Sequence, residues 1–260
     1  MKKAILATLS IIAVLSICLA GTVSAYKAGY MLPNYQAAME ITADGTIGAG
    51  EWDDAFGDWL YDGWTKTSTN PNFRHNWEMG GTPNIADQWL LDVVTDTTND
   101  AGDVFTFCFC GAQDDAATPQ AADDVLINHT HTETTIYRGT GSGWAPDPAI
   151  VLGENVIIAS SMASGHWVIE LKFDKTGAIA GTAFDSHIRV AAYDASTGKT
   201  VMWPPMSEKD VPSSWGLNDY TTFQSESNPI PEGLTIGVML VLSSVAAVVS
   251  IRYFRKPPKL

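Results

Sequence analysis

The chain has 260 residues, with 29 acidic and 15 basic side chains and a formal net charge of −14. All of the acidic residues but only nine of the basic ones lie within residues 26–233, so this part carries a formal charge of −20. Such a surface repels nucleic acid and anionic lipid, which excludes nucleic acid as a partner.

The first 25 residues are typical of a secretory signal peptide. Lys2 and Lys3 form a charged start, an apolar run follows over 4–19, and Val23-Ser24-Ala25 supplies the small residues that a signal peptidase reads. We expect cleavage after Ala25, because a retained N-terminal anchor would not need small residues after its apolar run.

A tight turn and a tryptophan open the predicted domain. Asp44-Gly45 favours a turn before the first strand. Trp52, directly after Glu51, is a large apolar side chain that can fix this end of the chain to a core. We therefore interpret this segment as structural.

Residues 58–87 show no helix or strand period and contain aromatic residues among Asn, Thr, Gly and Pro. We interpret them as a long irregular excursion, and long ordered loops often carry function. Sugar sites combine aromatic faces with a few polar groups. The candidate ligand-binding residues are the loop tryptophans with polar neighbours, whose alternative role is to cap the core: Trp59, Trp64, Trp77 and Trp144.

Short strand-like runs separated by Gly- and Asp-rich turns follow the irregular stretch. The clearest run places Phe105, Phe107 and Phe109 on one face, and both of its faces are largely apolar, which indicates a central strand of a two-layer structure. Cys108 and Cys110 share the other face, where a disulfide between them is strained, so we expect two buried thiols. The predicted strands cover 89–94, 103–110, 125–128, 133–138, 156–160, 167–173 and 188–193.

These runs predict an all-β fold, an antiparallel immunoglobulin-like or jelly-roll β-sandwich with long loops. The predicted extracellular domain spans 26–224, with its core over about 41–205, which is long enough for one medium-sized domain. An N-terminal signal helix and one C-terminal transmembrane helix complete the predicted chain.

Three segments resemble known domains. The opening segment 41–55, with its Asp-Gly and Glu-Trp, resembles the start of domains related to family 9 carbohydrate-binding modules. It also resembles the start of the DOMON-like haem domain related to the ethylbenzene dehydrogenase haem subunit. The segments His166-Trp167-Val168-Ile169-Glu170-Leu171-Lys172-Phe173 and Ile188-Arg189-Val190-Ala191-Ala192-Tyr193-Asp194 resemble two later strands of both. The resemblance implies a β-sandwich over about 41–203, with carbohydrate or haem as its ligand.

Haem b is the alternative ligand, and it needs axial ligands from His, Met or Lys. The axial candidates are His75 with Met79, and Met162 with His166. The chain has no CxxCH motif, so covalent attachment of haem is excluded.

Acidic loops offer the hard oxygen ligands that calcium prefers. The candidate calcium ligands are Asp100 with Asp103, and Asp114-Asp115 with Asp123 and Asp124, and the alternative is a set of solvated acidic loops. A glycosylation sequon begins at Asn128, which fits a domain outside the cell.

A second apolar segment lies near the C-terminus. Residues 234–251 carry no charge and would extend about 27 Å as a helix, close to the thickness of a bilayer core. The basic tail, 252–260, marks the cytoplasmic side. We therefore expect a single-pass protein of the cell membrane with its N-terminal domain outside the cell.

The polar linker 225–233 precedes this segment. The order of Pro-Glu, apolar span and basic end resembles the C-terminal sorting signals of archaeal and bacterial surface proteins, which exosortase- or archaeosortase-like peptidases process. A sortase-like peptidase is thus a predicted partner, and a permanently retained helix is the alternative. The residues of the predicted signal are Pro231, Glu232, Arg252, Arg255 and Lys256.

No nucleophile elbow, HExxH motif or Gly-rich phosphate loop occurs in the chain. The sequence therefore predicts a non-enzymatic binding module at the cell surface, for carbohydrate or adhesion, with a surface glycan or protein as its partner. Calcium is its candidate cofactor. The alternative function is a haem-binding domain for extracellular electron transfer.

Overall fold

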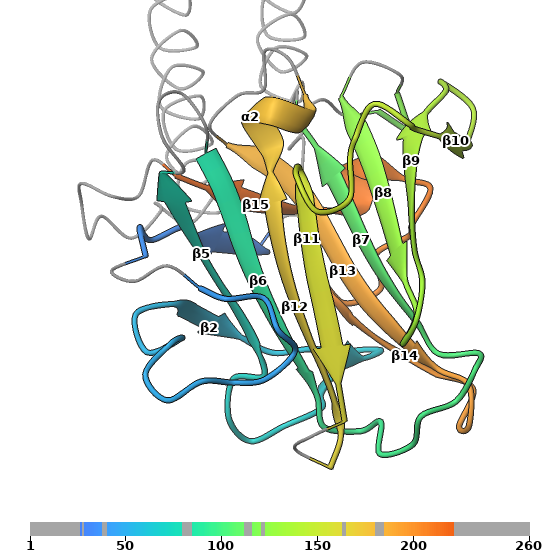
Figure 1. The fold of residues 1–260 in the computed structure, drawn as a ribbon. Coiled ribbons are helices and arrows are strands. Elements are labelled where there is room, and N and C mark those ends of the chain that lie inside the picture. The colour runs from blue at the N-terminus through green and yellow to red at the C-terminus, as the bar shows by residue number, and fades with distance from the viewer. Residues whose placement is uncertain are drawn as a thin grey trace, which may run out of the picture. The chain divides into compact units, whose positions relative to one another are not determined.

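Two β-sheets face each other in the computed structural model of the chain (Figure 1). The structure describes residues 27, 29–37, 41–79, 85–111, 116–120, 123–162, 165–179 and 185–220. These residues belong to one compact unit, Ser24–Gln224. The predicted signal peptide, linker, sorting signal, transmembrane segment and basic tail all lie outside the described residues. Within the described residues, no helix is long and apolar enough to cross a membrane.

The described strands fall into a larger and a smaller sheet. The larger sheet contains β1 (Met31–Pro33), β3 (Tyr61–Asp62), β4 (Thr65–Lys66), β7 (Val104–Cys110), β8 (Asp124–His129), β9 (Thr134–Gly139), β10 (Trp144–Pro146), β13 (Ser186–Asp194), β14 (Lys199–Trp203) and β15 (Gly216–Asp219). The smaller sheet contains β2 (Phe56–Asp58), β5 (Phe73–Met79), β6 (Ile85–Val93), β11 (Val156–Ser161) and β12 (Trp167–Asp174). Two short helices, α2 (Lys175–Ala178) and η1 (Pro212–Ser214), complete the described elements.

The strand order places the longest strands in the middle of each sheet. The larger sheet runs β10-β9-β8-β7-β13-β14-β3-β4, and β15 pairs with both β1 and β13. The smaller sheet runs β11-β12-β6-β5-β2. Every strand predicted from the sequence coincides with a strand of the structure within a few residues, so the predicted β-sandwich is confirmed.

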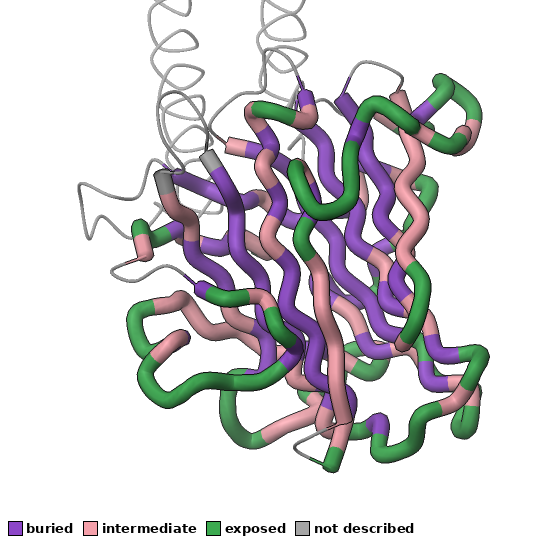
Figure 2. Tube along the Cα trace, viewed as in Figure 1, coloured by how far each residue is buried: buried purple, intermediate pink, exposed green. Residues whose placement is uncertain are grey.

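The hydrophobic core lies between the two sheets. Much of the central strands of both sheets is buried (Figure 2). Phe107 of β7 meets Trp89 of β6 at a ring-centroid distance of 5.6 Å and Phe173 of β12 at 5.9 Å. All three rings are fully buried. Each such side chain contributes roughly 1.5–3 kcal/mol through burial. Because β7 lies between β8 and β13, its predicted central position is also confirmed.

The other face of β7 is covered by the chain after β14. Cys108 and Cys110 are free, buried thiols that cluster with Leu126 and Trp215. The Cys108 Sγ atom lies 3.9 Å from the carbonyl oxygen of Lys209. Burial raises the pKa of the Cys108 thiol to about 11. The prediction of two buried thiols is therefore confirmed.

The opening segment is fixed to the outer face of the smaller sheet. Trp52 is buried there, and its Nε1 donates a hydrogen bond to Glu170 Oε1 on β12 at 2.9 Å. Glu170 Oε2 accepts the backbone N–H groups of Asp44, at 3.0 Å, and Gly45, at 2.9 Å. The predicted structural role of this segment is confirmed, and its anchor is a buried carboxylate.

The prediction of an irregular excursion over 58–87 is wrong in part, because β5 is a full strand that pairs with β6. Phe73 and His75 are buried on one face of β5, while on the other face Arg74 and Glu78 are half-buried and Asn76 is buried. The buried polar residues His75 and Asn76 hid the strand, because both count as polar in a hydrophobicity pattern.

The predicted antiparallel arrangement is confirmed for most of the described strand pairs, and one pair departs from it. β1 and β15 pair in parallel, with Met31 opposite Leu217 and Pro33 opposite Asp219. Neither strand was predicted from the sequence, since runs of three or four residues carry too little pattern.

Candidate functional site

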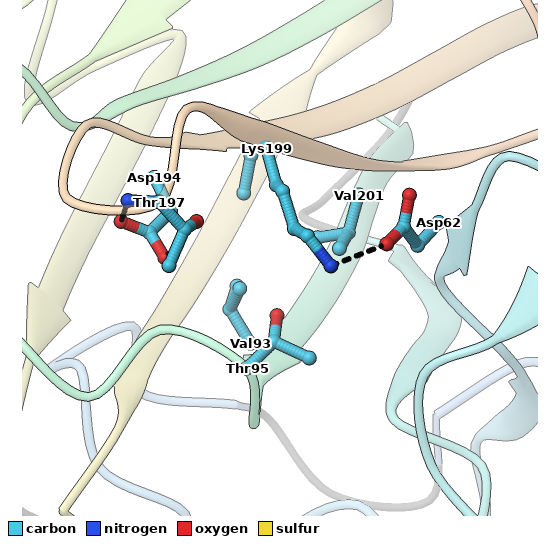
Figure 3. A pocket seen from close by; sticks show the side chains of 8 residues that line it. Asp62, Val93, Thr95, Asp194, Thr197, Lys199 and Val201 are labelled. Atoms are coloured by element: carbon cyan, nitrogen blue, oxygen red, sulfur yellow. Dashed lines mark hydrogen bonds and ion pairs between the residues drawn. The ribbon is translucent and has the colours of Figure 1, made fainter.

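A pocket of about 290 Å³ lies between the sheets where β13 turns into β14 (Figure 3). It is lined by residues of the β3 strand, the end of β6, the β13–β14 hairpin and the loop after β6. These residues are Asp62, Val93, Thr95, Ala192, Asp194, Thr197, Lys199 and Val201.

The pocket has an apolar floor and a polar rim. Val93, Ala192 and Val201 are buried core residues that form the floor. At the rim, Lys199 Nζ lies 3.1 Å from Asp62 Oδ2, and both side chains are about half exposed. Sites for small ligands commonly combine an apolar lining with a few polar groups of this kind.

Two tryptophans are close in sequence to the rim residue Asp62: Trp59 lies between β2 and β3, and Trp64 lies in the turn between β3 and β4. Trp64 follows Asp62 by two residues, through Gly63 with its positive φ of 59°, and is 65% exposed. Lys66 Nζ lies 3.0 Å from the ring centroid of Trp59. This cation–π contact holds the Trp59 ring against β4. The Trp64 ring has a cation–π contact of its own, with Lys27 Nζ 5.0 Å from its centroid, and most of the Trp64 surface is open to solvent.

The four predicted ligand-binding tryptophans do not form one site. Trp59 lies just before β3 and Trp64 in the β3–β4 turn, but Trp144 lies on β10 at the opposite edge of the larger sheet. There its Nε1 donates to Asp210 Oδ1 at 2.7 Å. Trp77 lies on β5 in the smaller sheet and packs against Tyr220, with a centroid distance of 5.7 Å.

The candidate haem ligands lie on β5 and in the connection between β11 and β12. His75 is fully buried and stacks on Trp89 at a centroid distance of 4.0 Å and an interplanar angle of 17°. Both ring nitrogens of His75 are buried and have no hydrogen-bond partner among the described residues, so a haem iron could reach them only if the core opened. Met79 ends the same strand, Met162 packs against the main core, and His166 forms an ion pair with Asp92. The described geometry thus offers no support for haem.

The structure keeps the calcium candidates Asp123 and Asp124 together but groups the Asp103 carboxylate with residues other than Asp100. Asp103 groups with Asp96 and Asp194, whose carboxylate oxygens lie within 4.8 Å of one another. Asp100 takes part only through its backbone N–H, which donates to Asp103 Oδ2 at 2.8 Å. Asp123 and Asp124 form a second buried group, with Cys110.

Asn128, the predicted glycosylation site, lies within β8 and is half-buried. Its Oδ1 accepts a hydrogen bond from Thr106 Oγ1 at 3.2 Å. Sequence reasoning placed the sequon outside the cell, and the structure places it on a strand rather than in a loop.

Sequence reasoning missed the two rim residues. Asp62 and Lys199 are far apart in the chain and become neighbours because β14 pairs with β3, with Val201 opposite Asp62. No local pattern marks β3, which has two residues, so only the pairing of the strands reveals the rim.

Sequence reasoning also missed a buried ion pair at the end of the sandwich opposite the pocket. Lys175 Nζ lies 3.9 Å from Asp87 Oδ2, and both side chains are almost completely buried. Burial raises the pKa of Asp87 to about 6 and lowers the pKa of Lys175. Lys175 Nζ also lies 3.7 Å from the ring centroid of Tyr220, so this cation is held by the fold.

Comparison with solved structures finds the same architecture elsewhere. A family 9 carbohydrate-binding module from Caldicellulosiruptor kristjanssonii, solved in complex with cellotriose, matches 76% of this chain and 100% of its own, with a TM-score of 0.50 and 11% identity. What the two share is the fold. A family 9 module from the same organism in complex with glucose matches with a TM-score of 0.47 and 10% identity, over 77% of this chain and 98% of its own.

The predicted likeness to family 9 modules is therefore confirmed for the fold. No family model and no curated protein matches the sequence. The likeness to DOMON-like haem domains stays a prediction.

Proposed function

We propose that this protein is a non-enzymatic module that binds neutral carbohydrate outside the cell and is tethered to the membrane. The observation that carries the proposal is the pocket with its apolar floor and its charged rim of Asp62 and Lys199, beside the exposed Trp64. The fold supports it, because a module of the same fold was solved with cellotriose.

The chemistry of the pocket suits a sugar ring. A carboxylate accepts hydrogen bonds from hydroxyl groups and an ammonium donates to them, while the floor contacts the apolar C–H face of the ring. The exposed Trp64 offers a second flat apolar face. The volume, about 290 Å³, lies near the lower end of the roughly 300–1,000 Å³ of ligand pockets, which suits one or two sugar units.

Charge and targeting support the choice of ligand and location. The formal charge of −20 over residues 26–233 disfavours acidic polysaccharides, so neutral glycans are the proposed ligands. The apolar segment 234–251 and the basic tail after it support a membrane tether. Cleavage by a sortase-like peptidase at Pro231-Glu232 is the alternative fate of that tether.

The test is calorimetric titration of the purified full chain with neutral oligosaccharides chosen from a glycan array. Asp62→Ala and Trp64→Ala should each weaken binding at least about tenfold, because each removes one side of the site. Tyr35→Ala, which also removes an exposed aromatic ring, is the matched control and should bind as the wild type does. Absence of any glycan binding, or an affinity that is unchanged in both Asp62→Ala and Trp64→Ala, would overturn the proposal.

A further inference from the structure

Three carboxylates meet at the end of the sandwich that holds the pocket. Asp96 follows β6, Asp103 precedes β7 and Asp194 ends β13. Their oxygens lie within 4.8 Å of one another, and the residues are 0%, 0% and 6% exposed. Pairing of β7 with β13 brings Asp103 beside Asp194. The loop after β6 brings Asp96 to both of them.

The described residues give this group little positive charge. His131 is the ion-pair partner that the structure shows, with its Nε2 at 2.9 Å from Asp103 Oδ2. Even a protonated His131 would leave a net charge of −2 on three ionised carboxylates. Buried charges are costly unless they are paired or coordinate a metal, so the group needs a proton or a further cation.

Neutral donors fix two of the carboxylates in place. Asp103 Oδ1 accepts the backbone N–H of Ala195 at 2.8 Å. Asp194 Oδ1 accepts the backbone N–H groups of Ser196, at 2.8 Å, and Thr197, at 3.1 Å. These bonds orient the two groups but leave their charge unchanged.

Asp96 differs from the other two. Its Oδ1 accepts the backbone N–H of Thr98 at 3.2 Å, but its Oδ2 is buried and has no hydrogen-bond partner among the described residues. A buried carboxylate oxygen without a donor is uncommon in folded proteins and calls for an explanation such as an ion. Asp96 offers one of its two carboxylate oxygens to the group whose ligand atoms lie within 4.8 Å of one another.

We propose that Asp96, Asp103 and Asp194 bind one divalent cation, calcium by preference. Calcium takes oxygen ligands at 2.3–2.6 Å, so two oxygens on one ion lie up to roughly 4.6–5.2 Å apart, which the observed spacing satisfies. The ion joins the loop after β6 to the β13–β14 turn, which contribute Thr95 and Thr197 to the pocket. The site does not depend on the proposed carbohydrate binding.

The test compares calcium-dependent stability in matched variants of the full chain. After treatment with EDTA, added calcium at 100-fold above its Kd should raise the Tm of the wild type by about 5–10 °C. Asp96→Asn keeps the shape and the bond from Thr98, and it should abolish this shift. Asp100→Asn removes a carboxylate from the same loop outside the group and should keep the shift.

A second measurement needs no variant. Terbium binds calcium sites, and Trp167 is positioned to excite it, since its backbone N–H donates to the Asp96 carbonyl at 3.0 Å and its ring lies 4.5 Å from that of His131. The wild type should show terbium luminescence that calcium displaces with a stoichiometry of one.

Three outcomes would overturn the proposal. The first is a wild type with neither a calcium-dependent Tm nor displaceable luminescence. The second is a calcium response that survives in Asp96→Asn or disappears in Asp100→Asn. The third is a calcium-insensitive wild type that becomes more stable at neutral pH in Asp96→Asn, which would mean that a proton balances the group.

Discussion

Glu170 shows how one buried side chain can secure the start of a domain. Its two oxygens accept three N–H donors, from the Trp52 indole and from the backbone of Asp44 and Gly45. Burial raises the pKa of this carboxyl in spite of those donors. The carboxylate therefore acts as a structural acceptor for a segment that comes from far away in the chain.

Replacement of Glu170 by Gln should be destabilising although the shape is kept. The amide NH₂ would face N–H donors and leave at least one of them without an acceptor, which costs about 1–3 kcal/mol of unfolding free energy. Urea unfolding measures this difference. The control is Asp53→Asn, on the exposed part of the same segment, and equal stability of both variants would contradict the role of Glu170.

The sequence predicted one half of this contact. Trp52 could be recognised as an anchor because a large aromatic residue beside a turn needs a buried place. Its partner could not, since Glu170 lies 118 residues away within a strand, where a glutamate would be expected to face solvent.

At the scale of elements, the turn at Gly45 fits closely against β11. Its φ is 82°, and a Cβ atom added there would lie 2.7 Å from the carbonyl carbon of Ser160. Ser161 Oγ donates to the Gly45 carbonyl on the same side. The turn therefore needs glycine for two reasons, its backbone conformation and the close approach of a strand.

Gly45→Ala and Gly141→Ala separate these two reasons. Gly141 has a similar φ of 87°, but a Cβ atom there meets nothing within 4 Å. Both variants should lose about 1 kcal/mol through backbone strain, and Gly45→Ala should lose about 1–3 kcal/mol more through the clash. Thermal or urea unfolding measures both, and equal losses would show that the close approach to Ser160 is unimportant.

Strands with clear alternation were predictable, and the others were not. β7 carries three phenylalanines on one face, which only a central strand can bury. β5 was missed because His75 occupies an inner position, where it stacks on Trp89. The rim of the pocket and the three-carboxylate group depend on pairing between distant strands, for which a single sequence contains no local signal.

At the scale of the whole molecule, His129 connects the two sheets. Its Nε2 lies 2.9 Å from Ser160 Oγ on β11 of the smaller sheet, and its Nδ1 lies 2.8 Å from Thr134 Oγ1 on β9 of the larger. Burial, with a smaller effect of His131, lowers the pKa of His129 to about 4. The neutral ring is thus the form that the folded protein favours.

The free energy of unfolding should therefore fall in acid, because His129 takes up a proton more readily in the unfolded chain. The pKa of His129 is about 4 in the folded state and 6.5 when unperturbed, so its contribution is present above pH 6.5 and is lost as the pH falls to 4. His129→Gln cannot titrate in this range. The difference in unfolding free energy between wild type and variant should shrink by about 2 kcal/mol from pH 7.5 to pH 4.

The comparison of the wild type with His129→Gln removes the effect of other buried titratable groups. Asp87, with its pKa raised to about 6, loses its contribution to stability as the pH rises from about 4 to 6, which is the opposite sign. That contribution is the same in both proteins and cancels in the difference. A difference that does not vary with pH would contradict the assignment to His129.

The pairing of the last described strand sets how the domain responds to mechanical load. β15 is antiparallel to β13, with Asn218 opposite Ser186, and the pocket lies at the other end of β13, at Ala192 and Asp194. If the proposed ligand is held in the pocket, a pull on the chain after Asp219 acts along both strands in opposite directions. Their hydrogen bonds are then sheared together instead of being unzipped one by one, which is the geometry that resists force best.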